Sequence, residues 1–239
     1  MLRTVDLARL AEEMEAPYRP ERLASVGSAS ASLFVCDDLR SWHRSEPEDT
    51  LLLVLEGVLV LESGASRAVA NDGEVFAVPR KHGHNLSAGM RSSVVLFGTE
   101  PADVAANGHM APPYAPASAV EKVNVAVGVL QGQPFEWLPL GGTGACQALA
   151  SRLWGASLPY TPADDCLLIV YRGVLDYTAD GERGTVVGSQ MLAIPAGTTL
   201  RFDSERGATV LLLVHAGARL PEALSSGAPS GGADRAEST

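Results

Sequence analysis

An internal repeat is the feature of this sequence that most constrains its fold. When the chain is compared with itself at an offset of 116 residues, DTLLLVLEGVL (49–59) aligns with DCLLIVYRGVL (165–175). The same offset, without a gap, places FAVP (76–79) on LAIP (192–195) and a later VVLF on VLLL. A shared offset at three separate places, with matching Gly and Pro residues, indicates two copies of one domain in tandem.

Both copies consist of short segments with the character of β-strands. From Ser28 onward, apolar runs such as SLFVC, LLLVL, EVFAVP and LLIVY alternate with turn signals such as Asn71-Asp72-Gly73 and Asp180-Gly181. Many short strands separated by turns are typical of a β-sandwich or a β-barrel. The sequence therefore predicts an all-β fold.

Composition and spacing set the predicted domain boundaries. Leu7, Leu10, Ala11 and Met14 follow the spacing of an apolar helix face, which predicts one short helix that ends by Pro17. A Pro- and Ala-rich segment in the middle of the chain reads as a linker, and the C-terminal tail lacks apolar residues that could anchor it. The predicted parts are an N-terminal helix and lead-in (1–27), a first barrel (28–100), a linker (101–118), a second barrel (119–224) and a disordered tail (225–239).

Charge and cysteine content narrow the possible partners. The formal net charge of −10 argues against nucleic acid or an anionic membrane as a partner, because phosphate binding needs clustered Lys and Arg. The three cysteines form no CxxC pair, which argues against a disulfide framework or a zinc knuckle. The N-terminus lacks the apolar core of a signal peptide, and the longest apolar run, Leu51–Leu55, is too short to span a bilayer. We therefore expect a cytoplasmic protein.

Two segments of the first copy carry motifs of a known family. WHRSEPEDTLLLVLEG has His43 and Gly57 at the first His and the closing Gly of one motif, and GEVFAVPRKHGHNL has Gly73, Pro79 and His84 at positions of a second. These segments resemble the two motifs of the cupins, which are small double-stranded β-helix barrels. The resemblance implies two tandem cupin barrels, a bacterial-type bicupin, with a homodimer as one expected assembly.

The resemblance also implies a metal site, from which this sequence departs. Cupins hold Mn, Fe, Ni or Zn with three His and one Glu, a donor set suited to these ions. Here Ser45 stands at the second His position and Thr50 at the Glu position, so only His43 and His84 remain. We therefore predict a degenerate site with no cofactor, or with one divalent metal (Zn, Fe, Mn or Ni) bound by His43 and His84 at low occupancy.

The second copy has lost the metal-ligand histidines of the motif. Pro159 and Thr161 align with His43 and Ser45, and Leu200 aligns with His84. We expect a barrel without metal. The candidate site therefore lies in the first barrel, where the candidate catalytic residues are His43 and His84 and the candidate pocket residues are Trp42, Ser45, Thr50 and His82.

His82 has two alternative interpretations. If the segment is extended, His82 and His84 point to the same side, and with His43 they form a three-imidazole site of the kind that can hold a catalytic zinc. If the segment after Pro79 is a loop, His82 is exposed instead.

Two classes of function remain open at this point. The first is a protein that binds a small organic molecule in the pocket of the first barrel, which accounts for Ser45 and Thr50. The second is an enzyme of the isomerase, cyclase or oxygenase type on a small carbonyl or aromatic substrate. Such an enzyme would use His43 and His84 with or without a metal, and the ordinary pKa of His suits a general base near pH 7.

Overall fold

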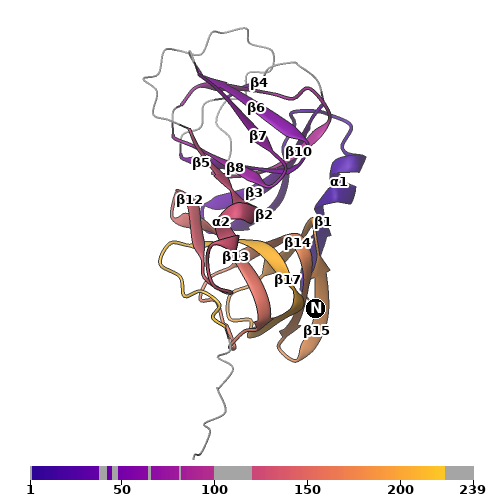
Figure 1. Ribbon diagram of the computed structural model, residues 1–239, viewed down its shortest axis with the longest axis vertical. Helices are drawn as coiled ribbons and strands as arrows, with labels where there is room; N and C mark the ends of the chain where they lie inside the picture. The colour runs from indigo at the N-terminus through magenta and orange to yellow at the C-terminus, as the bar shows by residue number, and fades with distance from the viewer. Residues whose placement is uncertain are drawn as a thin grey trace, which may run out of the picture.

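Strands dominate the computed structural model of the protein. It describes residues 2–37, 42–44, 48–63, 66–80, 82–99 and 120–223, without the side chains of residues 42–44 and 66. Within these residues the chain forms seventeen strands and two short helices, so the predicted all-β fold class is confirmed. The strands make two units that lie one above the other along the long axis of the molecule (Figure 1). The predicted linker and tail fall outside the described residues, and their boundaries stay predictions.

The N-terminal unit is built from two antiparallel sheets. Its strands are β2 (Glu21–Val26), β3 (Ala29–Cys36), β4 (Trp42–Arg44), β5 (Thr50–Glu56), β6 (Val58–Ser63), β7 (Ser66–Asn71), β8 (Glu74–Val78), β9 (His84–Ser87), β10 (Ser92–Gly98) and β11 (Glu121–Asn124). One sheet has the order β11-β8-β5-β10-β3-β2, and the other has the order β4-β9-β6-β7. Among the candidate site residues, Trp42 and His43 belong to β4, Thr50 to β5 and His84 to β9.

The C-terminal unit repeats this strand order in one sheet. Its strands are β1 (Arg3–Asp6), β12 (Leu138–Thr143), β13 (Cys146–Ala156), β14 (Cys166–Ala179), β15 (Glu182–Val187), β16 (Gln190–Ile194) and β17 (Leu200–His215). The order is β1-β16-β14-β17-β13-β12, with β15 paired to β14. The long strands β14 and β17 cover the positions of β5–β6 and β9–β10. The repeated sequence segments therefore occupy equivalent places in the two units.

Each unit receives its outer strand from the segment that precedes the other unit. β1 pairs with β16 of the C-terminal unit, and β11 pairs with β8 of the N-terminal unit. A short helix follows each of these strands, α1 (Leu7–Glu13) after β1 and α2 (Val125–Leu130) after β11. Asp6 and Asn124 cap the two helices by accepting a hydrogen bond from the backbone three residues on. The predicted helix is confirmed, whereas strand β1 was not predicted.

Three clusters of buried side chains stabilise the fold. One lies inside each unit, and the third lies between the units. β5 serves two of them, because Leu52 and Val54 point into the N-terminal unit while Leu51, Leu53 and Leu55 point toward the C-terminal unit. This double burial explains why the strand reads as a continuous apolar run.

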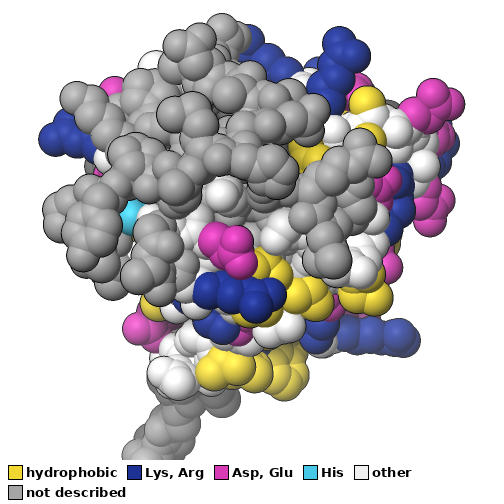
Figure 2. Space-filling model, turned by 90° about the horizontal axis from the view of Figure 1, so that it is seen from above, with side chains coloured by type: hydrophobic (Ala, Val, Ile, Leu, Met, Phe, Trp, Pro, Cys, Tyr) yellow, Lys and Arg dark blue, Asp and Glu magenta, His cyan; other side chains and the backbone are white. Residues whose placement is uncertain are grey.

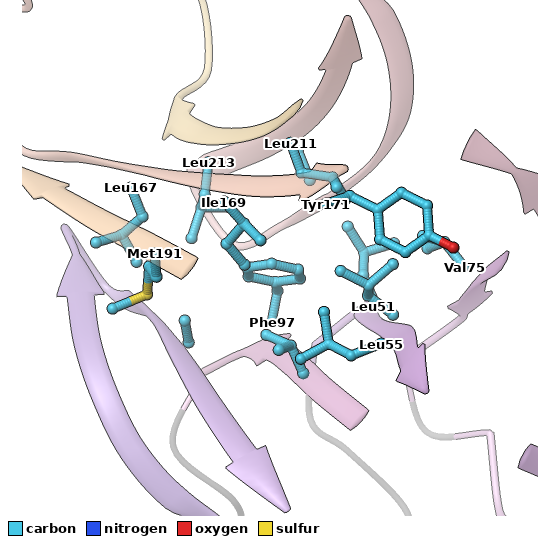
Figure 3. Close-up of a cluster of buried hydrophobic side chains, with 14 of the residues drawn as sticks. Leu51, Leu55, Val75, Phe97, Leu167, Ile169, Tyr171, Met191, Leu211 and Leu213 are labelled. Carbon is cyan, nitrogen blue, oxygen red and sulfur yellow. The ribbon is translucent and has the colours of Figure 1, made fainter. Parts of the chain in front are cut away.

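Figure 3 shows the cluster between the units. Side chains from both units meet there, and its labelled members are Leu51, Leu55, Val75 and Phe97 from the N-terminal unit and Leu167, Ile169, Tyr171, Met191, Leu211 and Leu213 from the C-terminal unit. Burying a side chain of this size stabilises the folded state by about 1.5–3 kcal/mol relative to leaving it exposed. The two copies therefore form one continuous hydrophobic structure.

The matching glycines of the repeat occupy a turn that needs glycine. Gly57 and Gly173 have φ values of +93° and +94°, a region that side chains rarely adopt. A Cβ at Gly57 would overlap Ser92, and one at Gly173 would overlap the backbone of Gly207. These glycines let β5 continue into β6, and the first half of β14 into its second half.

Candidate functional site

Only part of the predicted set of site residues lies among the residues that the structure describes. Thr50, His82 and His84 have described side chains. Ser45 lies outside the described residues, as do the side chains of Trp42 and His43. Figure 2 views the molecule from above, onto the N-terminal unit, and a small area of histidine surface is visible from that side.

The backbone register relates β4 to β9. His43 pairs with Asn85, and Arg44 pairs with His84. Paired positions in an antiparallel ladder share one face of the sheet, so the register groups position 44 with His84. The predicted meeting of His43 with His84 stays a prediction.

His84 is buried and held in one orientation. The residue is 1% exposed, and its Nδ1 lies 2.8 Å from the carbonyl oxygen of His82. A carbonyl oxygen only accepts, so Nδ1 carries the proton in this contact. The neutral ring then has its lone pair on Nε2, which is the arrangement of a hydrogen-bond acceptor, a general base or a metal ligand.

His82 is buried beside His84, and the exposed alternative for His82 is therefore wrong. Its exposed fraction is 4%, and its ring centroid lies 6.5 Å from that of His84 with 22° between the ring planes. The His82 amide donates to the carbonyl oxygen of Pro79 at 3.2 Å, which closes a turn. The Nε2 atom of His82 is buried and has no hydrogen-bond partner among the described residues. The loop after Pro79 thus carries two buried imidazoles.

Two contacts with residues distant in sequence hold this loop in place. The carboxylate of Asp49 accepts a hydrogen bond from the Arg80 amide at 2.8 Å, and the Ser63 hydroxyl donates to the Gly83 carbonyl at 3.1 Å. In the C-terminal unit the equivalent Asp165 accepts from the Ala196 amide at 2.9 Å. The conserved geometry at both repeats explains why Asp49 and Asp165 are identical. The identity of these two residues is visible in the repeat, but their role depends on the geometry of the loop.

Thr50 occupies the position of the Glu in the metal motif. It is buried, pairs with Val78, and shares the inward face of β5 with Leu52 and Val54. Its hydroxyl lies 3.4 Å from the Glu48 carbonyl oxygen. Among the described side chains, no three His, Cys, Asp or Glu residues lie close enough together to hold a metal ion. The described donors therefore do not form a complete metal site.

The equivalent end of the C-terminal unit is closed by packed side chains. Tyr160 pairs with Leu200 as Arg44 pairs with His84, and both belong to the core of this unit. Cys166, at the position of Thr50, lies beside the Tyr160 hydroxyl. Burial raises the pKa of the Cys166 thiol to about 12 and also raises the pKa of Tyr160. A thiol with this pKa is almost entirely protonated at neutral pH and is a poor nucleophile.

A hollow of about 590 Å³ lies elsewhere, on the outer face of the C-terminal unit. It is lined by residues of β13, β14, β15 and β17, among them Arg183, Arg201, Asp176 and Asp203. It contains no His or Cys and lies on the opposite unit from His82 and His84. Its size alone gives no chemical reason to prefer it as the functional site.

No helix in the part of the chain that the structure describes has the length and apolar character needed to cross a membrane.

Comparison with solved structures identifies the fold. No family model and no curated protein sequence matches the chain. The cupin 2 conserved barrel domain protein from Leptotrichia buccalis is similar, with a TM-score of 0.70 and 13% identity over 90% of this chain and 97% of that one. Salicylate 1,2-dioxygenase from Pseudaminobacter salicylatoxidans is also similar, with a TM-score of 0.68 and 12% identity over 90% of this chain and 84% of the enzyme. The protein therefore has the cupin fold, as the motifs of its first repeat predicted.

Proposed function

We propose that the two units are tandem cupin barrels and that the N-terminal one binds a small organic molecule next to His82 and His84. The observation that carries this proposal is the buried Nε2 of His82, which has no hydrogen-bond partner among the described residues. A buried polar atom without a partner costs about 1–3 kcal/mol, so such atoms are normally satisfied by water, an ion or a ligand. A ligand that donates or accepts at this atom would recover that free energy.

The neighbouring imidazole supports the same site. The Nδ1 contact of His84 with the His82 carbonyl fixes the ring, so the two imidazoles keep a constant spacing. Fixed polar groups next to an apolar wall are typical of small-molecule pockets. Val78 and Leu86, on the strands next to this loop, belong to the buried apolar cluster of this unit.

The difference between the two units supports a function for one of them only. Leu200 replaces His84 in the C-terminal unit, and Tyr160 and Cys166 fill the space near it. A site that existed only to stabilise the fold would be expected in both copies. We infer that the C-terminal unit supports its partner and binds no ligand of its own at this end.

An enzyme that uses a divalent metal is the alternative, and the orientation of His84 is the observation that favours it. A ring with its proton on Nδ1 and its lone pair on Nε2 is prepared to bind a metal ion. His43 would have to supply a second ligand. Against this alternative stands Thr50, because a neutral hydroxyl does not replace the charge of the missing Glu.

The test begins with protein purified without a His tag. We expect less than stoichiometric Fe, Mn, Ni and Zn by elemental analysis. We also expect saturable binding in a calorimetric screen of small aromatic acids, beginning with salicylate and gentisate, which the similar dioxygenase structures name. His82→Ala and His84→Ala should each weaken binding at least about tenfold, whereas the matched control His215→Ala, exposed on the C-terminal unit, should not.

Two results would overturn the ligand-binding proposal. Stoichiometric metal that is lost in His43→Ala and His84→Ala would favour the metalloenzyme. Binding that is unchanged in both His82→Ala and His84→Ala would remove these histidines from the site.

A further inference from the structure

A cluster of arginines lies on the C-terminal unit, away from the histidines. Arg152 of β13 and Arg172 of β14 both pair with Thr209 of β17, so the three residues form a row across neighbouring strands. These three residues, together with Arg206 and Trp154, are among those that line a hollow of about 250 Å³. Figure 1 shows β13, β14 and β17 together in the lower unit. Three guanidinium groups and an exposed indole therefore surround one small space.

The described acidic groups only partly neutralise this cluster, although the whole chain carries a formal charge of −10. Arg172 forms an ion pair with Asp72 at 3.2 Å. The guanidinium carbon of Arg152 lies 5.5 Å from the ring centroid of Trp154, within the range of a cation–π contact. The Nε atom of Arg152 is buried and has no hydrogen-bond partner among the described residues. A buried charged donor of this kind favours binding of an anion.

Strand irregularities shape the floor of the hollow. Gly173 and Gly207 have φ values of +94° and +84°, and the pairing of β14 with β17 shifts on both sides of Gly173. A Cβ at Gly173 would overlap the Gly207 carbonyl oxygen, so the two backbones touch at this point. Bulges redirect the side chains around them and are frequent next to binding sites.

The N-terminal unit provides an internal comparison. Ser93 takes the place of Thr209 there and pairs with Val35 and Glu56, which are the counterparts of Arg152 and Arg172. The repeat offset places Met90 at the position of Arg206. The same strand arrangement therefore forms without any of the three arginines. Their presence in the C-terminal unit is not a requirement of the fold.

We propose that this hollow binds a small planar organic anion. Its carboxylate or phosphate would lie between Arg152, Arg172 and Arg206, because a guanidinium group forms bidentate hydrogen bonds with either kind of anion. Its ring would stack on Trp154, which is 56% exposed. The volume of about 250 Å³ lies just below the range of pockets for drug-sized molecules, so the ligand is a single-ring compound or one phosphate with the group next to it.

The experiment titrates the full chain with three probes while tryptophan fluorescence is recorded. Benzoate represents an aromatic carboxylate, phenyl phosphate represents an aromatic phosphate, and inorganic phosphate lacks a ring. We expect saturable quenching by benzoate or by phenyl phosphate, stronger for the one whose anion the site prefers, and weaker binding of both at high salt. Inorganic phosphate should bind at least about tenfold more weakly than the preferred ring-bearing probe.

Variants assign the binding to this hollow. Arg206→Gln and Arg152→Gln should weaken binding at least about tenfold, and Trp154→Phe should abolish the fluorescence change while calorimetry still detects binding. Arg201→Gln, an exposed arginine on the other hollow of the same unit, is the matched control and should bind like the wild type.

Several results would overturn the proposal. One is the absence of saturable binding by either ring-bearing probe. A second is an affinity that is unchanged in both Arg206→Gln and Arg152→Gln. A third is an affinity for inorganic phosphate equal to that for the preferred ring-bearing probe. Binding that is lost in His82→Ala would also overturn it, because it would place the anion at the site of the N-terminal unit. Arg206 is exposed, so its variant remains informative if Arg152→Gln fails to fold.

Discussion

The loop that carries His82 and His84 depends on one carboxylate, and this dependence can be measured against an internal control. Asp49 accepts a hydrogen bond from the Arg80 amide at 2.8 Å, and Asp165 accepts from the Ala196 amide at 2.9 Å. The two bonds are equivalent in sequence and in geometry. Asp49→Ala and Asp165→Ala therefore remove the same interaction from the two units.

The magnitude follows from the exposure of the two pairs. A hydrogen bond to a charged group is worth about 1.5–3 kcal/mol when buried, but both bonds lie in exposed surroundings. Caps in which a side-chain oxygen accepts from a backbone amide typically contribute about 1 kcal/mol, and we expect that value for each variant. In a domain of this size, such a loss lowers the Tm by about 2–4 °C. Asp→Asn retains an acceptor oxygen and should lose less.

The assay combines urea denaturation with the ligand titration described above. Both alanine variants should lower the free energy of unfolding by similar amounts. Only Asp49→Ala should also weaken binding next to His82, because Asp165 supports a loop without histidines. Wild-type stability in both variants would refute the assigned role of the carboxylates. Equal loss of binding in both would refute the assignment of the ligand site to the N-terminal unit.

Three further predictions concern the core and the packed end of the C-terminal unit. Gly73 has a φ of +73°, and Gly73→Ala would place a Cβ against the Tyr171 ring. Urea denaturation should show a loss of at least about 1–2 kcal/mol in the free energy of unfolding. In the control Gly89→Ala the new Cβ meets open space, so the free energy of unfolding should change little. Phe97→Ala in the cluster between the units should cost about 3–5 kcal/mol by the same measurement, and a loss below about 1 kcal/mol would contradict the packing in Figure 3. In the folded protein the pKa of the Cys166 thiol is raised from its ordinary value of 9.0 to about 12. Above pH 9 the unfolded chain loses this proton while the folded chain keeps it, so the free energy of unfolding should fall as the pH rises from 9 toward 12. Cys166→Ala should reduce this fall, and an unchanged pH profile would show that other groups cause it.

Much of the fold could be predicted from the repeat, because local sequence determines the strands and turns. The Gly at 57 and 173 marks a turn that only glycine fits, and the apolar runs mark strands that are buried on both faces. Strand β1 could not be predicted in this way. Its four residues are mostly exposed, and it exists because β16, almost two hundred positions later in the chain, offers an unpaired edge.

The motif names candidate site residues, but it does not specify the contacts that surround them. Thr50 and His84, two positions that the motif singles out, are both buried in the N-terminal unit. The burial of His82 was not predictable from spacing, since the loop that carries it is held by long-range contacts with Asp49, just before β5, and with Ser63 of β6. The register of β4 against β9 also depends on long-range pairing, which a gapped motif does not specify.

The exchange of outer strands has a consequence for how this chain can be divided. A fragment that ended before β11 would keep β1 and α1, whose partner β16 is absent, and would expose the edge of β8. β1 and β11 occupy equivalent positions in the two units. Two such fragments could therefore pair the β1 strand of each with the open β8 edge of the other, by exchanging their first strands. The single chain therefore resembles a strand-swapped homodimer whose two subunits have become covalently joined. In that arrangement one half could lose its pocket while still completing the sheet of the other.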